Sequence, residues 1–417
     1  MPNIAIVGAG IIGLWCAYEL GRRGARVTVI DKGTPGDGCS SGNTGWIVPS
    51  FSGPIAAPGL VGTSLRWMLS RDSPLYIRPA AMPRLAGWLL RFRRHCNARD
   101  YQRGLKAVAE LGRPTMALFD ALRADGVPFE MHHQGVLFVV LTRRTMDHVR
   151  ADLDRMQPYG YAPPNVLSGD EVRDLEPTLR TEVAGGVLVE EERHVRPETL
   201  VAGLVRRLDE LGVTVRAGVE VTGARRRGRA VVALSTAGMG EIEADHFLLA
   251  AGAWSGEVGR RFGLRLPVQA GKGYSITLHD PALALHRALY LDEAKVACSA
   301  FQGGLRLAGT MELSGVNDTV DTRRIDAIRR GADRYFTRWH HGERETVWMG
   351  MRPLTPDGLP VIGPAPGCEN LFVATGHAML GVTLAPATAR VLADLILGQE
   401  VGVDLAPFAP GRFAGAG

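Results

Sequence analysis

Hydrophobic runs separated by glycine turns organise both ends of the chain. Near the start, the β-branched run at residues 4–7 precedes a glycine turn, an apolar helical stretch and a second strand-like run at residues 26–30. Near the end, residues 370–398 read as a strand, a turn at Gly376 and a long helix. Strands that alternate with helices in this way predict an α/β fold with a Rossmann-like domain.

The first turn carries the spacing of a dinucleotide-binding loop. Gly8 permits the tight turn, Gly10 lets the backbone approach a pyrophosphate, and Gly13 lets the helix pack on the strand. Asp31 follows 18 residues after Gly13, where a carboxylate can accept hydrogen bonds from a ribose diol. Because strand, turn, helix and acid occur in order, we predict that a dinucleotide binds here.

Two later stretches favour FAD over NAD. A buried strand within residues 241–255 ends at Ala251 and Gly252, a small pair that lets the backbone come close to a ligand. The C-terminal helix begins near Gly381, and its N-terminal amides would stabilise the negative charge of a reduced flavin, whereas reduced nicotinamide is neutral. The sequence has no second GxGxxG before a helix, so we expect the organic substrate to reduce the flavin directly.

Composition narrows the class of protein. A chain of 417 residues predicts about two domains, and its net charge of +5 is only mildly basic. The arginine run at residues 224–230 lies between two strand-like runs and is interpreted as a solvated hairpin turn, so no nucleic-acid partner is expected. Five scattered cysteines without CxxC spacing favour neither a disulfide framework nor a metal site. We expect a cytoplasmic protein without a spanning helix.

The segment at residues 84–99 leaves two interpretations open. Leu85, Trp88, Leu89 and Phe92 form an apolar stripe at helical spacing, and several arginines lie beside it. Helices that lie on anionic membranes have this pattern, which would place the protein peripherally at the inner face of the membrane. Ordinary packing of a helix with a charged outer face explains it equally.

Beyond the glycine loop, the chain resembles the FAD-dependent D-amino-acid oxidase family along nearly its whole length. The resemblance rests on the stretches CSSGNTGWIVPS (39–50), LLAAGAWS (248–255), LPVQAGKGYSIT (266–277), YLDEAKVACSAFQGGLRLAGTMEL (290–313) and MGMRPLTPDGLPVIG (349–363). Segments 73–79 and 88–99 are most similar to the D-amino-acid dehydrogenase branch, which lies close to the glycine oxidases.

The family resemblance implies a set of flavin contacts. They fall at the glycine loop and the end of the second strand, in the loop near residue 40, and at the turns before the later helices. By position they are Gly8, Gly10, Gly13, Asp31, Lys32, Ser40, Ser41, Asn43, Thr44, Gly45, Val221, Ala251, Gly252, Gly376, Leu380, Gly381, Val382 and Thr383.

Three departures from the family pattern bear on the pocket. Dehydrogenases of this branch tend to have a smaller polar residue where this chain has Trp46. Glycine oxidase has a tyrosine that assists the substrate carboxylate, and Val296 occupies its place here. Sarcosine oxidases attach flavin through a cysteine that the stretch before Pro353 lacks, so noncovalent FAD is expected.

The resemblance and the residue chemistry give three catalytic candidates. Arg352 matches the arginine that grips the substrate carboxylate, and a guanidinium suits bidentate capture of that group. The alternative is a structural arginine paired with Asp357. Tyr274 either closes over the substrate or packs within a sheet. We favour an orienting role for His377 over general-base catalysis.

The predicted reaction is oxidative deamination of a D-amino acid. Hydride would move from Cα to flavin N5, and the imine would hydrolyse to a 2-oxo acid and ammonia, with O2 or a quinone reoxidising the flavin. One alternative is a biosynthetic or catabolic flavin amine oxidase acting on glycine, an N-methyl amino acid or an imino acid. An alternative of another class is a noncatalytic FAD-binding module.

Motif order predicts a discontinuous arrangement of domains. We expect an FAD-binding domain of the glutathione-reductase type from residues 1–50, 185–265 and 347–417. Residues 51–184 and 266–346 would form an α+β substrate domain built on an antiparallel sheet that roofs the flavin, flanked by helices from residues 60–125.

Overall fold

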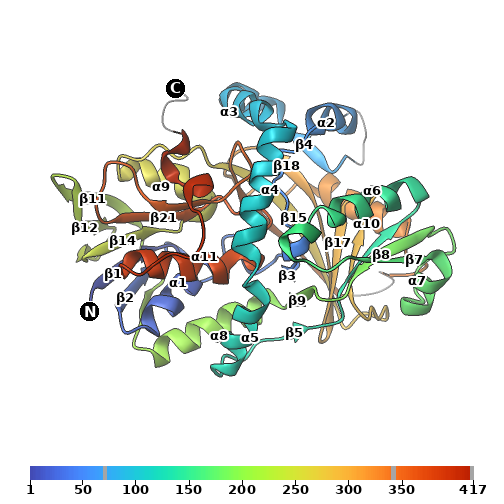
Figure 1. Ribbon diagram of the computed structural model, residues 1–417, viewed down its shortest axis with the longest axis horizontal. Coiled ribbons are helices and arrows are strands. Elements are labelled where there is room, and N and C mark those ends of the chain that lie inside the picture. Colours follow the sequence, from blue (N-terminus) through green and yellow to red (C-terminus); the bar gives the residue numbers. More distant parts are fainter. Residues whose placement is uncertain (69–72, 340–343, 414–417) are drawn as a thin grey trace.

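The computed structural model describes residues 1–68, 73–339 and 344–413. Two β-sheet regions lie side by side, with one long helix running between them (Figure 1). The predicted α/β fold with a second, largely antiparallel domain is confirmed.

The first region is built on a six-stranded sheet. In spatial order its strands are β10 (Thr214–Arg216), β2 (Arg26–Ile30), β1 (Asn3–Val7), β14 (His246–Leu249), β21 (Leu371–Thr375) and β20 (Val361–Pro364). All neighbouring pairs are parallel except β20 with β21. Alternate residues of β1 enter different cores, because Ile4 and Ile6 face one layer while Ala5 and Val7 face the other.

Helices cover one face of this sheet and a small sheet covers the other. The helical layer comprises α1 (Ile11–Gly21), α8 (Pro197–Glu210) and α11 (Gly381–Ile396). The opposite layer comprises β11 (Val221–Arg227), β12 (Ala230–Thr236), β13 (Gly240–Glu243) and α9 (Ser255–Arg261). The arginine run at residues 224–230 therefore lies in the β11–β12 hairpin, as expected from its pattern.

The second region is a nine-stranded sheet. Its path is β19 (Arg344–Leu354), β15 (Gln269–His279), β18 (Gly304–Leu313), β17 (Val296–Phe301), β16 (Ala288–Leu291), β6 (Val136–Val140), β8 (Gly185–Val189) and β7 (Asn165–Ser168), and β4 (Leu75–Ile77) pairs with β18. Its helices are α6 (Arg143–Asp154), α7 (Gly169–Leu175) and α10 (Thr322–Asp333). Two pairs in this sheet, β16 with β6 and β18 with β4, are parallel.

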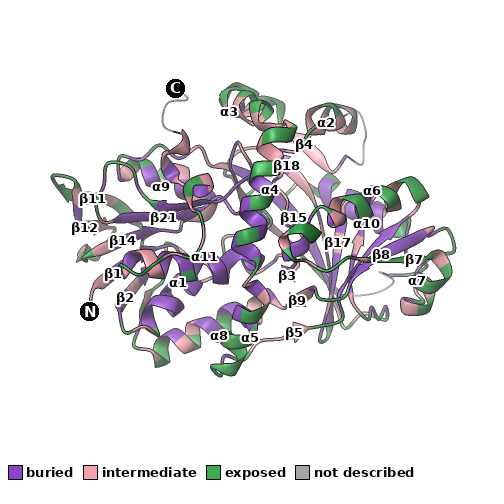
Figure 2. Cartoon of the chain, in the orientation of Figure 1, coloured by how far each residue is buried: buried purple, intermediate pink, exposed green. Residues whose placement is uncertain are grey.

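The remaining elements lie between or beside the two regions. They are the small sheet of β3 (Trp46–Ile47), β9 (Arg193–Val195) and β5 (Met131–His132), the helices α2 (Leu60–Met68), α3 (Met82–His95), α4 (Ala98–Gly112) and α5 (Thr115–Ala124), and 3-10 turns at Pro49–Phe51, Pro79–Ala81, Gln157–Tyr159, Gly252–Trp254, Ala406–Phe408 and Pro410–Phe413. Figure 2 shows the central strands and α11 largely buried, whereas α2 and α3 are largely half-buried or exposed.

Sheet membership differs from the predicted domain boundaries at three places. Strands β8 and β19 belong to the nine-stranded sheet, although we had assigned their residues to the FAD-binding domain. Helices α4 and α5 contribute Val108, Leu111 and Phe119 to the core around α1 and α11. An apolar strand or helical stripe shows that a surface is buried but does not show which sheet buries it, which explains these differences.

The stripe on α3 packs against the protein. Leu85 is buried with Leu313 and Leu354, and the indole N–H of Trp88 donates to the carbonyl of Pro267 at 2.9 Å. The apolar spacing is therefore accounted for by packing. Within the described ranges, no helix is long and apolar enough to cross a bilayer.

One stability prediction follows from the packing of α1 on β1. A Cβ at Gly13 would lie 1.9 Å from the carbonyl oxygen of Gly8, which is backbone and cannot move aside. We expect Gly13→Ala to lower the free energy of unfolding by at least about 2 kcal/mol through overpacking. Urea unfolding followed by circular dichroism measures the change.

Gly87 on α3 is the matched control, since nothing lies within 4 Å of a Cβ there. Gly87→Ala should be neutral or stabilise the protein by about 0.5–1 kcal/mol. Equal unfolding midpoints for the two variants would contradict the close contact at Gly13.

Candidate active site

A large cavity of about 1360 Å³ lies between the two regions. The six-stranded sheet contributes its strand ends and following turns, and the nine-stranded sheet contributes one face. Thirteen of the predicted flavin contacts line this cavity: Gly8, Gly10, Asp31, Lys32, Ser40, Asn43, Thr44, Val221, Ala251, Gly252, Leu380, Gly381 and Val382.

Two helix N-termini meet at the cavity. Gly10 precedes α1 and Leu380 precedes α11, and neither residue supplies a side-chain cap to its helix. The amide of Ile11 donates to the Ser40 hydroxyl at 2.9 Å, so the loop near residue 40 is tied to the start of α1. The remaining first-turn amides and the positive ends of both helix dipoles make this part of the cavity suited to anionic groups.

The glycines of the first loop leave room for a ligand. Gly8 has φ of 115°, and a Cβ there would lie 2.4 Å from the carbonyl oxygen of Ala250. Beside Gly10 the nearest atom to a Cβ is the Ser40 hydroxyl at 3.4 Å, and beside Gly252 nothing lies within 4 Å. The cradle therefore fits a dinucleotide whose phosphates approach the backbone closely.

The acid after β2 is held at the cavity by the backbone. One Asp31 oxygen accepts from the amide of Ala9 at 2.6 Å, and the other accepts from the amide of Gly33 at 2.8 Å. Lys32 lies over the ring of Trp254, with its ammonium 4.6 Å from the centroid. These contacts fix Asp31 where a ribose hydroxyl could donate to it.

Arg352 projects from β19 and lines the cavity beside Gly273 on the neighbouring strand β15, which has no side chain. Its guanidinium donates to the carbonyl of Thr310 at 2.8 Å, and a Cβ at Gly273 would lie 2.3 Å from its central carbon. Burial holds the pKa of Arg352 below its ordinary value. Among the described residues, no carboxylate lies within ion-pair distance of it.

The alternative pairing of Arg352 with Asp357 is wrong. Both oxygens of Asp357 accept from Arg412, at 2.7 and 3.1 Å. Arg352 is left with a carbonyl partner and a formal charge that its described neighbours do not neutralise. A half-buried cation of this kind is stabilised when an anionic ligand binds.

Aromatic side chains surround the same part of the cavity. The ring of Tyr290 on β16 makes edge contacts with Trp46 at 5.8 Å and with Phe138 at 5.8 Å. The indole N–H of Trp46 donates to the Ser299 hydroxyl at 2.9 Å. Trp46 therefore does line the cavity, held in place from β17.

Sequence reasoning missed Tyr290. Positional comparison pointed to Val296, which is buried in the core on the α10 side of the sheet. Tyr290 lines the cavity from the adjacent strand, and its pKa is raised by burial, a shift that the charges of Lys295 and Arg352 oppose. Only the pairing of β16 with β17 reveals it, because no local spacing connects it with Arg352.

The contacts of Tyr274 favour packing within the sheet over closing onto the substrate. Its hydroxyl donates to Glu312 at 2.6 Å and accepts from the amide of Asp321 at 3.2 Å. Tyr274 is among the residues that line the cavity, but its side chain packs in the core beneath α10, whereas Gly273 and Arg352 lie on the opposite face of the sheet. Alternation along β15 therefore supports the packing alternative for Tyr274.

His377 is buried at the turn before α11. Its Nε2 forms a hydrogen bond with the Thr388 hydroxyl at 3.0 Å, and its Nδ1 has no partner within the described part of the chain. Burial lowers the pKa of His377 to about 3, so the imidazole is neutral near pH 7. A neutral ring held by Thr388 supports the orienting role.

Five predicted flavin contacts do not line the cavity and have structural contacts instead. They are Gly13, Ser41, Gly45, Gly376 and Thr383. A Cβ at Gly45 would lie 1.8 Å from the carbonyl oxygen of Val195. The Thr383 hydroxyl donates to the carbonyl of Trp46 at 3.0 Å and accepts from the amide of Val48 at 3.1 Å, which fixes β3.

No cluster of three or more His, Cys, Asp or Glu side chains suited to a metal ion occurs among residues 1–68, 73–339 and 344–413. The five cysteines are free.

Comparisons with known proteins agree with this architecture. The model of the FAD dependent oxidoreductase (DAO) family matches residues 3–395. A D-amino acid dehydrogenase from Methylobacterium radiotolerans is 33% identical over 99% of this chain and 100% of its own length. Glycine oxidase from Geobacillus kaustophilus is similar in structure with a TM-score of 0.76 and 25% identity, over 99% of both chains. L-alpha-glycerophosphate oxidase from Mycoplasma pneumoniae with FAD bound has a TM-score of 0.74 at 16% identity, over 98% of this chain and 97% of its own.

The buried neutral imidazole predicts a loss of stability in acid. The unfolded chain binds a proton at His377 below about pH 6.5, whereas the folded chain binds it only near pH 3, so the free energy of unfolding falls as pH decreases through that interval. We expect His377→Gln to reduce the loss between pH 7.5 and 5 by up to about 2 kcal/mol. Urea unfolding at the two pH values measures it.

His148 provides the control, because its side chain is 73% exposed. His148→Gln should leave the acid sensitivity unchanged. A His377→Gln variant as acid-sensitive as the parent protein would show that the imidazole is not buried in neutral form.

Proposed function

The chain belongs to the FAD-dependent oxidoreductase (DAO) family, and from this premise we propose that it oxidatively deaminates a D-amino acid. The observation that carries the proposal is the half-buried guanidinium of Arg352, which lines the cavity without a carboxylate partner among the described residues. A substrate carboxylate would accept two parallel hydrogen bonds from this guanidinium. The full-length similarity to D-amino acid dehydrogenases supports the substrate class.

Different residues around the cavity would bind different parts of FAD. The start of α1 with Gly8 and Gly10 would hold the phosphates, Asp31 the ribose, and the start of α11 the electron-rich edge of the flavin. Bound FAD supplies the two-electron acceptor that takes a hydride from the carbon bearing the amine. Cysteine is absent from the stretch before Pro353, in keeping with noncovalent binding.

The protein's own contribution is mainly orientation. Arg352 fixes the carboxylate, and Tyr290 with Trp46 limits the space on one side of the substrate. His377 remains neutral at working pH and keeps the turn before α11 in place. The substrate ammonium loses its proton to solvent, and water then hydrolyses the imine product to a 2-oxo acid and ammonia.

Two alternatives remain distinguishable by experiment. Trp46 against Tyr290 narrows the pocket, which favours a smaller substrate such as glycine, an N-methyl amino acid or an imino acid. An anaerobic screen of flavin bleaching across these amines and D-amino acids identifies the class. A noncatalytic FAD-binding module would remain yellow with all of them.

The electron acceptor is proposed to be either O2 or a quinone. Mixing the reduced protein with air separates the two, since rapid reoxidation indicates an oxidase and slow reoxidation a dehydrogenase. Either acceptor is compatible with the site, because the chain's residues act on the amine half-reaction.

The first prediction here concerns Arg352. We expect Arg352→Met to slow anaerobic flavin reduction by D-amino acids by at least about a hundredfold, because a charge-assisted hydrogen bond contributes about 1.5–3 kcal/mol and two are lost. Arg352→Lys should recover part of the rate, because it restores the positive charge without the planar guanidinium that donates two parallel hydrogen bonds. Stopped-flow absorbance of the flavin band measures both.

The matched control is Arg225→Met, at an exposed ion pair with Glu241 on the β11–β13 sheet. In this variant, D-amino acids should reduce the flavin at the parental rate. If Arg352→Met were reduced by D-amino acids as fast as the parent protein, Arg352 would have no part in the reaction.

A second prediction concerns peripheral membrane contact, which we propose for the exposed surface of α3. Met82 and Leu90 line the cavity but are 43% and 60% exposed, and Arg84 and Arg94 are exposed on the same helix. We expect cosedimentation with vesicles containing phosphatidylglycerol, weakened by salt and by Leu90→Glu. Met239→Glu, at a 45% exposed site on the β12–β13 turn, should not weaken it. Vesicle binding unaffected by Leu90→Glu would exclude α3 as the contact.

A further inference from the structure

A row of polar side chains crosses the buried face of the nine-stranded sheet. Thr277 on β15, Arg306 on β18 and Ser299 on β17 are direct neighbours in register, and Ser275 lies two residues away on β15. All four are buried, with Arg306 only 4% exposed. A buried cation in an otherwise apolar sheet requires partners, and they lie on the loop that follows Cys39.

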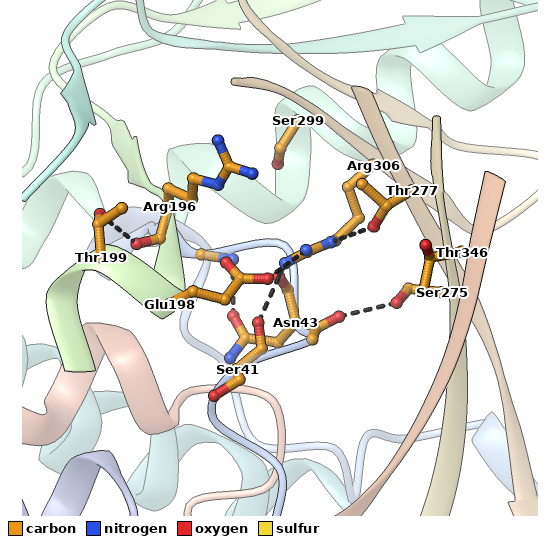
Figure 3. Close-up of polar contacts among 12 residues, drawn as sticks. Ser41, Asn43, Arg196, Glu198, Thr199, Ser275, Thr277, Ser299, Arg306 and Thr346 are labelled. Atoms are coloured by element: carbon orange, nitrogen blue, oxygen red, sulfur yellow. Dashed lines mark hydrogen bonds and ion pairs between the residues drawn. The ribbon is translucent and has the colours of Figure 1, made fainter. Parts of the chain in front are cut away.

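Four successive carbonyls of that loop accept hydrogen bonds from this row. Arg306 donates to the carbonyls of Ser41 at 3.1 Å and Asn43 at 2.8 Å. Ser275 donates to Gly42 at 2.8 Å, and Ser299 donates to Thr44 at 2.7 Å. Figure 3 shows the Arg306 side chain extending from its strand to the loop, with Glu198 next to its guanidinium.

The direction of the carbonyls fixes the direction of the amides. In a trans peptide the C=O and the following N–H point in opposite directions. The amides of Gly42, Asn43 and Thr44 therefore point away from the sheet, and all three residues line the cavity. No backbone partner for these three amides occurs among the described residues.

The charge of Arg306 adds a second effect. A guanidinium bound to a carbonyl polarises the whole peptide group, so that the N–H on its far side becomes a stronger donor. Arg306 also forms an ion pair with Glu198 at the start of α8, and that carboxylate partly offsets its charge. The amides aimed at the cavity would stabilise negative charge there, as on a reduced flavin.

We propose that Arg306, together with Ser275 and Ser299, is a positioning clamp that aims the amides of residues 42–44 at the flavin and thereby raises both FAD affinity and the reduction potential of the bound flavin. The clamp acts through the loop and touches no reacting atom. The proposal rests on FAD as the cofactor and does not depend on which amine is the substrate.

The test measures FAD release from the holoenzyme and the two-electron midpoint potential by equilibration with a reference dye. For Arg306→Met we expect at least tenfold weaker FAD binding. We also expect a lower potential, where a tenfold loss of preference for the reduced form equals about 30 mV. Arg306→Lys should recover part of both. Arg225→Met serves as the control and should match the parent protein.

Glu198→Gln distinguishes the clamp from a merely structural ion pair. It removes the counter-charge and leaves the bonds of Arg306 to Ser41 and Asn43 in place. The clamp predicts a potential that is unchanged or higher, whereas a structural ion pair predicts that Glu198→Gln and Arg306→Met lower stability alike and leave the potential alone. The second pattern would overturn the proposal.

If Arg306→Met does not fold, the pair of changes Ser275→Ala and Ser299→Ala carries the test. It removes two of the four loop contacts without removing a charge. The proposal expects weaker FAD binding and a smaller decrease in potential in the same direction. Parental affinity and potential in that double variant would refute it.

Discussion

The half-buried positive charge of Arg352 is the constraint on which the proposed function of this protein depends. The side chain lies against the carbonyl of Thr310 and the bare backbone of Gly273, and its described neighbours offer no carboxylate. Removing a guanidinium from water without a counter-ion is costly, so the cavity favours an anion at this position. An amino acid supplies that anion on the atom next to the one that is oxidised, which fixes the reacting carbon relative to the flavin.

Other parts of the cavity also favour anionic groups. Helices α1 and α11 both direct their N-termini toward it, and the row containing Arg306 turns the amides of residues 42–44 toward it. Phosphates, a reduced flavin and a carboxylate are each anionic, and each would meet backbone or guanidinium donors. Donor groups from both sheet regions therefore line the same cavity.

The sequence was most informative where function depends on local geometry. The spacing of Gly8, Gly10 and Gly13 predicted the first loop because tight turns and close packing exclude side chains at fixed intervals. Arg352 was found through its family motif. Tyr290 and Arg306 could not be found in this way, because their places in the site depend on which strands pair across the nine-stranded sheet. The two alternatives for Tyr274 could not be separated from the sequence, because the face that it occupies follows from the pairing of β15, which places its side chain toward α10.

The central claim can be tested without turnover. Oxidised holoenzyme titrated with benzoate should show a saturable change in its visible flavin band, because the carboxylate would bind Arg352 beside the flavin. Benzamide has the same shape without the charge and should bind roughly ten- to a hundredfold more weakly, since hydrogen bonds to charged groups contribute about 1.5–3 kcal/mol. Equal dissociation constants for the two ligands would contradict the account.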